Sequence, residues 1–143
     1  MIPDFNNDGL LPKGIYWATM NEIRDKLGFS NRRMELLLGL EEATRSFKSA
    51  NCSTMYLDGS FVTSKIEPGD IDVCYDFTGM DPTKLDPVLL DFKNERAAQK
   101  KKYGCEFFMS HWGAILNPPI TYFDFFQRDK TTGSQKGIIG LKL

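Results

Sequence analysis

The sequence contains no long apolar run, no closely spaced cysteine pair and no excess of basic residues. No apolar stretch approaches the roughly 20 residues that a membrane-spanning helix needs, and the first eight residues contain neither a basic nor an apolar signal region. We therefore expect no membrane contact and no secretory signal. The three cysteines, Cys52, Cys74 and Cys105, are isolated, which favours buried thiols in a reducing cytoplasm over disulfides or a zinc site.

The charges nearly cancel, with 18 basic and 19 acidic residues and a net charge of -1. A domain that binds nucleic acid through its phosphates alone is usually more basic, so this class is disfavoured. One local basic group, Lys93, Arg96 and 100–102, has two interpretations. It either places favourable charge at a helix C-terminus or forms a contact site for RNA or another polyanion.

The length of 143 residues is typical of one domain, and 41% hydrophobic with 26% charged residues is ordinary for a globular protein. We predict a single domain over residues 1–143. Within it, residues 1–50 form an N-terminal helical extension and residues 54–109 form the core that carries the motifs.

Two helices are predicted in the first fifty residues. The first covers residues 15–27, although the capping-box spacing of Thr19 and Glu22 allows its regular part to begin only there, and Gly28 ends it. The second runs from Ser30 as N-cap to Ala50 and has one apolar face.

Short strands and further helices are predicted in the rest of the chain. Strands are expected at 54–57, 70–76, 105–109 and 137–143. A third helix runs from Asp86 to 102 and ends at Gly104, and a short helix follows Pro118 and Pro119. This order predicts an α+β fold, a small mixed β-sheet with helices packed mainly on one face.

Asp70 and Asp72 carry the most informative spacing in the chain. Side chains two residues apart in a strand point to the same face, so these carboxylates lie side by side. Two adjacent carboxylates repel each other unless a positive charge lies between them, and oxygen ligands favour Mg²⁺ or Mn²⁺ over zinc. The alternative is two solvated acids on an edge strand.

Gly59 and Ser60 follow the strand at 54–57 and suit a phosphate-binding turn. Glycine lets backbone N–H groups approach an anion closely, and serine adds a hydroxyl donor. A nine-residue loop, 61–69, joins this turn to Asp70. The preceding Asp58 is expected to orient the turn or cap the next element.

Gly59-Ser60 followed by Asp70-Ile71-Asp72-Val73 resembles the signature of DNA polymerase β-type nucleotidyltransferases, over about residues 54–109. More loosely, most of the chain resembles a bacterial group of nucleotidyltransferase-like proteins. That likeness includes 57–65, Pro68, the opening segments Phe5-Asn6 and 9–15, and the closing segments 125–127 and 136–138.

The resemblance implies a nucleotidyltransferase-like fold and Mg²⁺-dependent transfer of a nucleotidyl group from a nucleoside triphosphate, such as ATP, to a protein or RNA hydroxyl. It also implies a third carboxylate that binds metal with Asp70 and Asp72. Glu106 is our first choice and Asp124 the second, and Lys65 is placed to touch the phosphates. Glu106 could instead face solvent from its strand.

The same resemblance implies a macromolecular acceptor or a cognate partner protein, a toxin–antitoxin or phage-defence setting, and the possibility of an oligomer. A second hypothesis is a catalytically idle nucleotidyltransferase-fold module that serves in binding or as an antitoxin. A third, an RNA-binding domain, is disfavoured by the net charge.

Two further groups have a structural and a functional interpretation. His111, the single histidine, is expected to be structural, with a proton-acceptor role as the alternative. The aromatic residues Tyr122, Phe123, Phe125 and Phe126 are expected to belong to the core, with base stacking as the alternative.

Overall fold

The computed structural model describes all 143 residues and contains a five-stranded mixed sheet in the order β1-β7-β2-β3-β4. The strands are β1 (Ile15–Trp17), β2 (Thr54–Asp58), β3 (Ile71–Tyr75), β4 (Cys105–Met109) and β7 (Ile138–Lys142). The outer pairs β1–β7 and β3–β4 are parallel, whereas β2 is antiparallel to both of its neighbours. The prediction of a mixed sheet in an α+β fold is confirmed.

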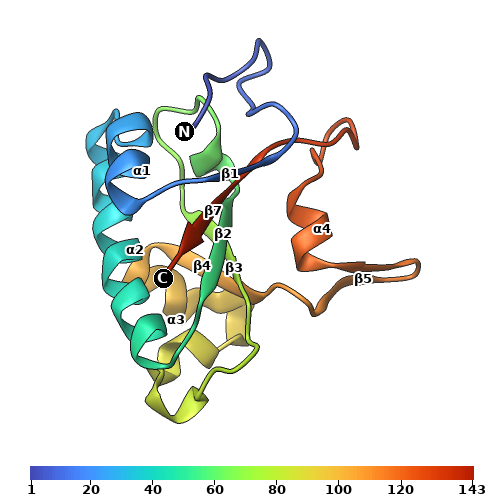
Figure 1. The fold of residues 1–143 in the computed structure, drawn as a ribbon. Coiled ribbons are helices and arrows are strands. Elements are labelled where there is room, and N and C mark those ends of the chain that lie inside the picture. Colours follow the sequence, from blue (N-terminus) through green and yellow to red (C-terminus); the bar gives the residue numbers. More distant parts are fainter.

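Helices α1 (Met20–Leu27) and α2 (Asn31–Ser49) lie side by side against one face of this sheet, and α3 (Lys93–Tyr103) packs beside α2 (Figure 1). Most of the buried apolar side chains form one cluster between these helices and the sheet. Phe47 of α2 contacts the rings of Tyr75 and Phe107, with ring centroids 4.8 and 5.2 Å apart.

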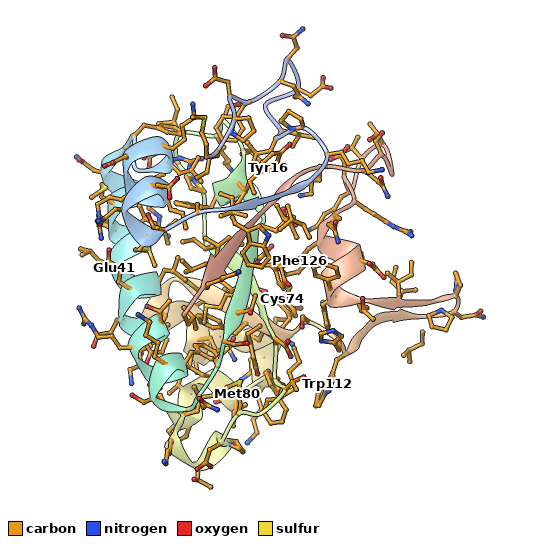
Figure 2. All side chains as sticks on the ribbon, in the orientation of Figure 1. Tyr16, Glu41, Cys74, Met80, Trp112 and Phe126 are labelled. Atoms are coloured by element: carbon orange, nitrogen blue, oxygen red, sulfur yellow. The ribbon has the colours of Figure 1, made fainter.

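The opposite face of the sheet is covered by α4 (Tyr122–Phe126), and a two-stranded hairpin of β5 (Gly113–Leu116) and β6 (Pro119–Thr121) projects beyond it (Figure 1). Phe126 lies between α4 and the sheet (Figure 2) and forms a second buried cluster with Cys74 and Ile138.

Several predicted elements are confirmed at their ends. Ser30 is the N-cap of α2 and accepts from the backbone N–H of Arg33, and Ala50 is its C-cap. The capping box of Thr19 and Glu22 begins α1, and Gly28 ends it. The strands predicted at 54–57, 70–76, 105–109 and 137–143 correspond to β2, β3, β4 and β7.

The prediction of helix at residues 15–17 is wrong, because this segment is strand β1. Ile15 pairs with Ile138 and Trp17 with Gly140 in parallel register. The capping box at Thr19 starts the helix only after the strand has ended, and the β-branched and aromatic residues before it suit a strand.

The prediction of one helix from Asp86 to 102 is only partly right. Asp86 caps a 3₁₀ helix, η3 (Pro87–Leu90), and the chain then breaks before α3, which ends at Gly104 as predicted. Gln99 Nε2 donates to the carbonyl of the buried Leu89 at 3.1 Å, so the break folds η3 against α3.

The β5–β6 hairpin was not predicted. None of the helices combines the length and apolar character that crossing a bilayer requires.

Candidate functional site

Strand register brings three acidic residues into one row across the sheet. Asp58 of β2 pairs with Asp72 of β3, and Asp72 pairs with Glu106 of β4. Cross-strand partners point to the same face of a sheet. Because Val73 belongs to the core under the helices, the alternation of the strand places Asp72 on the opposite face, toward α4.

Asp70 joins this row from the end of the loop before β3. Asp70, Asp72 and Glu106 are half-buried, and each offers a carboxylate oxygen within 4.8 Å of the others. Such an all-oxygen set fits a hard divalent cation such as Mg²⁺ or Mn²⁺. The structure thus places together the three residues that the sequence interpretation selected.

The surroundings of Asp72 and Glu106 disfavour the charged forms of their carboxyl groups. Burial, and then the neighbouring Asp70 and Asp58, raise the pKa of Asp72 to about 6. Burial, a hydrogen bond with Asp70 and the charges of Asp72 and Asp70 raise the pKa of Glu106 to about 7. Lys100 Nζ lies 3.5 Å from Glu106 and opposes this shift. A bound divalent cation would offset the same repulsion.

Asp58 is paired with a lysine from the far end of the chain. Lys136 Nζ lies 2.8 Å from Asp58 Oδ1, and the two side chains are only 11% and 8% exposed. Burial raises the pKa of Asp58 to about 6, although Lys136 opposes the shift. This ion pair joins β2 to the segment before β7 and leaves the other three carboxylates available for a metal.

A cavity of about 280 Å³ surrounds these acids. It also contains the basic residues Arg128, Lys130 and Lys136 and the aromatic residues Phe108, Tyr122, Phe125 and Phe126. Arg128 and Lys130 form no ion pair with any carboxylate, in contrast to Lys136. Two free cations therefore lie in the same cavity as a group of repelling carboxylates, and this combination suits a metal-bound polyphosphate.

Gly59 lies directly against this site. Its φ of +81° is in the left-handed region, and a Cβ atom there would lie 2.7 Å from Asp72 Oδ2. Only glycine allows both the conformation and the close approach. Ser60 begins the 3₁₀ helix η1 (Ser60–Val62) and is not among the residues that line the cavity.

Besides Ser60, two further predicted residues lie outside the cavity. The side chain of Lys65 is exposed, and its backbone carbonyl accepts hydrogen bonds from Arg33. Asp124 is exposed on α4 and lines no part of the cavity, so the structure groups Glu106, and not Asp124, with the aspartates.

Sequence reasoning assigned no role in the site to Arg128, Lys130 or Lys136. It expected Asp58 only to orient the Gly59-Ser60 turn or to cap the next element. The segment around 128–136 approaches the acids because β7 pairs with β2, a contact between strands about eighty residues apart that no local pattern reports. Asp58 could have been found from its place beside Gly59 at the end of a strand.

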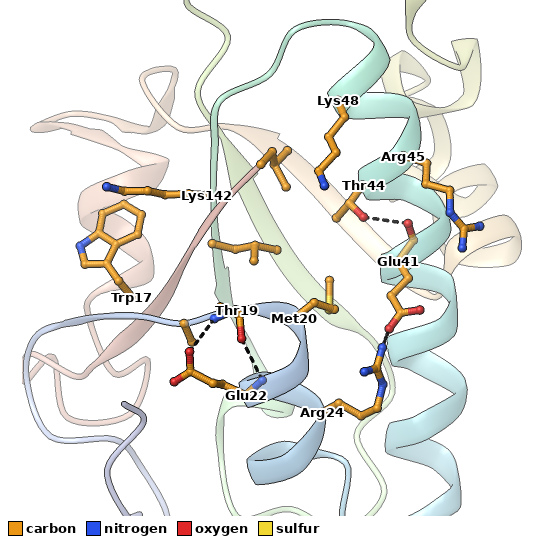
Figure 3. A pocket seen from close by; sticks show the side chains of 13 residues that line it. Trp17, Thr19, Met20, Glu22, Arg24, Glu41, Thr44, Arg45, Lys48 and Lys142 are labelled. Atoms are coloured by element: carbon orange, nitrogen blue, oxygen red, sulfur yellow. Dashed lines mark hydrogen bonds and ion pairs between the residues drawn. The ribbon is translucent and has the colours of Figure 1, made fainter.

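A larger cavity, of about 580 Å³, lies elsewhere, between α1, α2 and the end of β7 (Figure 3). Several of its polar groups pair with one another. Arg24 forms an ion pair with Glu41, and Thr19 and Glu22 satisfy each other in the capping box. Its two carboxylates, Glu22 and Glu41, are engaged in these contacts and form no metal-binding cluster, so the smaller cavity is the better candidate for chemistry.

The model of a protein family described as a family of unknown function, DUF6932, matches residues 3–142. The chain therefore belongs to this family. Comparison with curated proteins and comparison with solved structures each gave no match.

Proposed function

We propose that this chain is a Mg²⁺-dependent nucleotidyltransferase that moves a nucleotidyl group from a nucleoside triphosphate to a hydroxyl of a protein or RNA. The observation that supports it most directly is the meeting of Asp70, Asp72 and Glu106 within 4.8 Å of one another. These acids share a cavity with the unpaired cations Arg128 and Lys130.

The residues have separate roles in this proposal. Asp70, Asp72 and Glu106 hold the divalent cation, which supplies positive charge against the phosphates when it is bound. Arg128 and Lys130 bind and orient the triphosphate, and Gly59 allows the backbone to approach it. The chain thus contributes position and charge rather than a covalent nucleophile.

The fold and setting belong to the same proposal. A mixed sheet that carries acids on neighbouring strands agrees with the nucleotidyltransferase-like fold that the sequence resemblance implies. A cytoplasmic location, a macromolecular acceptor or cognate partner protein, and a role in a toxin–antitoxin or phage-defence pair rest on that resemblance.

A second candidate is a catalytically idle binding or antitoxin module of the same fold. One observation favours it. Lys136 neutralises Asp58 at 2.8 Å, and Lys100 lies 3.5 Å from Glu106, so the chain's own cations offset part of the acidic charge without a metal.

Calorimetric titration with ATP, GTP, CTP and UTP in the presence of Mg²⁺ tests the proposal. We expect metal-dependent binding by the wild type and its loss in Asp70→Asn/Asp72→Asn. The control Asp8→Asn/Asp25→Asn removes the same charge from exposed positions and should bind like the wild type. Absence of triphosphate binding by the folded wild type would contradict an enzyme that acts alone and would favour the binding module.

A further inference from the structure

The loop of residues 61–69 joins the two halves of the candidate site, since it runs from the Gly59 turn to Asp70. It is held chiefly by the first turn of α2. Ser30 Oγ donates to the carbonyl of Ile66 at 2.7 Å. Arg32 donates from Nε to Pro68 at 3.2 Å and from Nη2 to Gly69 at 2.7 Å.

Arg33 makes the largest contribution to this anchoring. Its side chain is fully buried, and it has no carboxylate partner within ion-pair distance. Instead, its guanidinium donates only to backbone carbonyls: Leu27 at 3.1 Å, Phe61 at 2.7 Å, Thr63 at 2.6 Å, and Lys65 at 2.9 Å from Nε and 2.6 Å from Nη2.

A buried charge without an opposite charge is costly, so this position needs extensive compensation. The carbonyl dipoles supply it through charge-assisted hydrogen bonds. The rings of Phe29 and Phe61 add to it, with centroids 4.0 and 4.9 Å from Arg33 Cζ. Burial lowers the pKa of Arg33 to about 10, so the side chain stays charged at neutral pH.

The shape of the guanidinium is as important as its charge. Its fork of donors reaches carbonyls at three separate points of the loop, Phe61, Thr63 and Lys65. A lysine offers one nitrogen and reaches fewer of them. The path of the loop, and hence the position of Asp70 directly after it, therefore depends on this one side chain.

We propose that Arg33, assisted by Arg32, is a positioning residue for the carboxylate site. By fixing the loop it places Asp70 beside Asp72 and Glu106 before any cation binds. This inference rests on the proposed metal-binding function. Loss of a residue that orients metal ligands typically weakens metal affinity by about 10–100-fold, and we expect a decrease of that size.

The test is calorimetric titration with Mn²⁺ alone, at a temperature where every variant is folded. Arg33→Lys keeps the charge and removes the fork, so we expect its Mn²⁺ affinity to fall about 10–100-fold, with faster amide exchange in the loop. The control Leu40→Ala opens a cavity at a buried position of α2. It should lower the melting temperature yet bind Mn²⁺ like the wild type.

The outcomes separate this inference from the proposed function. Mn²⁺ binding by the wild type with unchanged affinity in Arg33→Lys would overturn the positioning role alone. No Mn²⁺ binding by the wild type would overturn the metal site and the role of Arg33 in it together. If Arg33→Lys does not fold, Arg32→Met decides, because it removes the bonds to Pro68 and Gly69 and, besides these, only the exposed ion pair with Glu35. It should weaken Mn²⁺ binding several-fold, and unchanged affinity would overturn the proposal.

Discussion

At the residue scale, Gly59 shows how a single missing side chain permits the candidate site. Its φ of +81° and the 2.7 Å approach of a Cβ atom to Asp72 Oδ2 both oppose substitution. We expect Gly59→Ala to destabilise the fold by about 1–3 kcal/mol and to weaken Mn²⁺ binding, because Asp72 must shift. Denaturant unfolding and Mn²⁺ titration measure the two effects.

Gly69, at the end of the loop that follows the Gly59 turn, provides a matched control. It has no positive φ, and a Cβ atom there would meet nothing within 4 Å. Gly69→Ala should therefore change the free energy of unfolding by less than about 0.5 kcal/mol and leave Mn²⁺ affinity unchanged. Equal effects of the two substitutions would show that the close approach of Gly59 to Asp72 has no importance for metal binding.

At the scale of elements, the register of β3 and β4 decides which acid completes the metal site. Glu106 is the partner of Asp72 in this register, whereas Asp124 is exposed on α4. We expect Glu106→Gln to lower Mn²⁺ affinity at least about tenfold, since a charged oxygen ligand is lost. Asp124→Asn should bind like the wild type. The opposite ranking in titration calorimetry would mean that α4, not β4, supplies the third ligand.

Elements with local signals were predictable from the sequence. Ser30 and Gly28 mark helix ends through capping, and the alternation around Asp70 and Asp72 identified both a strand and a pair of carboxylates on one face. Glu106 was selected because the resemblance implies a third carboxylate on a neighbouring strand, and its strand lies in the stretch predicted at 105–109.

Elements that depend on distant partners were not predictable. Strand β1 exists through its pairing with β7, and a three-residue strand has too few positions to show a period. The ion pair of Asp58 with Lys136 and the carbonyl bonds of Arg33 likewise join residues far apart in the sequence. The three carboxylates proposed to bind metal were therefore predictable from the sequence, whereas the cations of the cavity and the hydrogen bonds that anchor the loop were not.

At the scale of the whole molecule, a net charge of -1 conceals a local concentration of charged groups of both signs. Asp58, Asp70, Asp72 and Glu106 gather at one end of the sheet in a single cavity. The fold thus concentrates carboxylates where burial raises the pKa of several of them. Lys100 and Lys136 form ion pairs with two of these acids, and Arg128 and Lys130 lie in the same cavity without a direct partner. The stability of the metal-free protein should consequently depend on pH.

The direction of this dependence follows from the raised pKa values of Asp72, about 6, and Glu106, about 7, against 3.8 and 4.5 without the fold. Between these limits the folded state binds more protons than the unfolded state, so the free energy of unfolding falls as pH rises from about 5 to 7.5. We expect the melting temperature of the metal-free protein to fall over this range.

Mn²⁺ should raise the melting temperature more at pH 7.5 than at pH 5, because at the lower pH the cation must displace protons from its ligands. In Asp72→Asn/Glu106→Gln the melting temperature should depend little on pH and should rise little with Mn²⁺, and thermal melts at the two pH values measure both effects.

If Mn²⁺ raises the melting temperature of the wild type equally at pH 5 and pH 7.5, the ion binds at a place other than these carboxylates. The reason is that a cation bound by groups with raised pKa values must compete with protons, whereas one bound to ordinary surface carboxylates meets little competition at either pH.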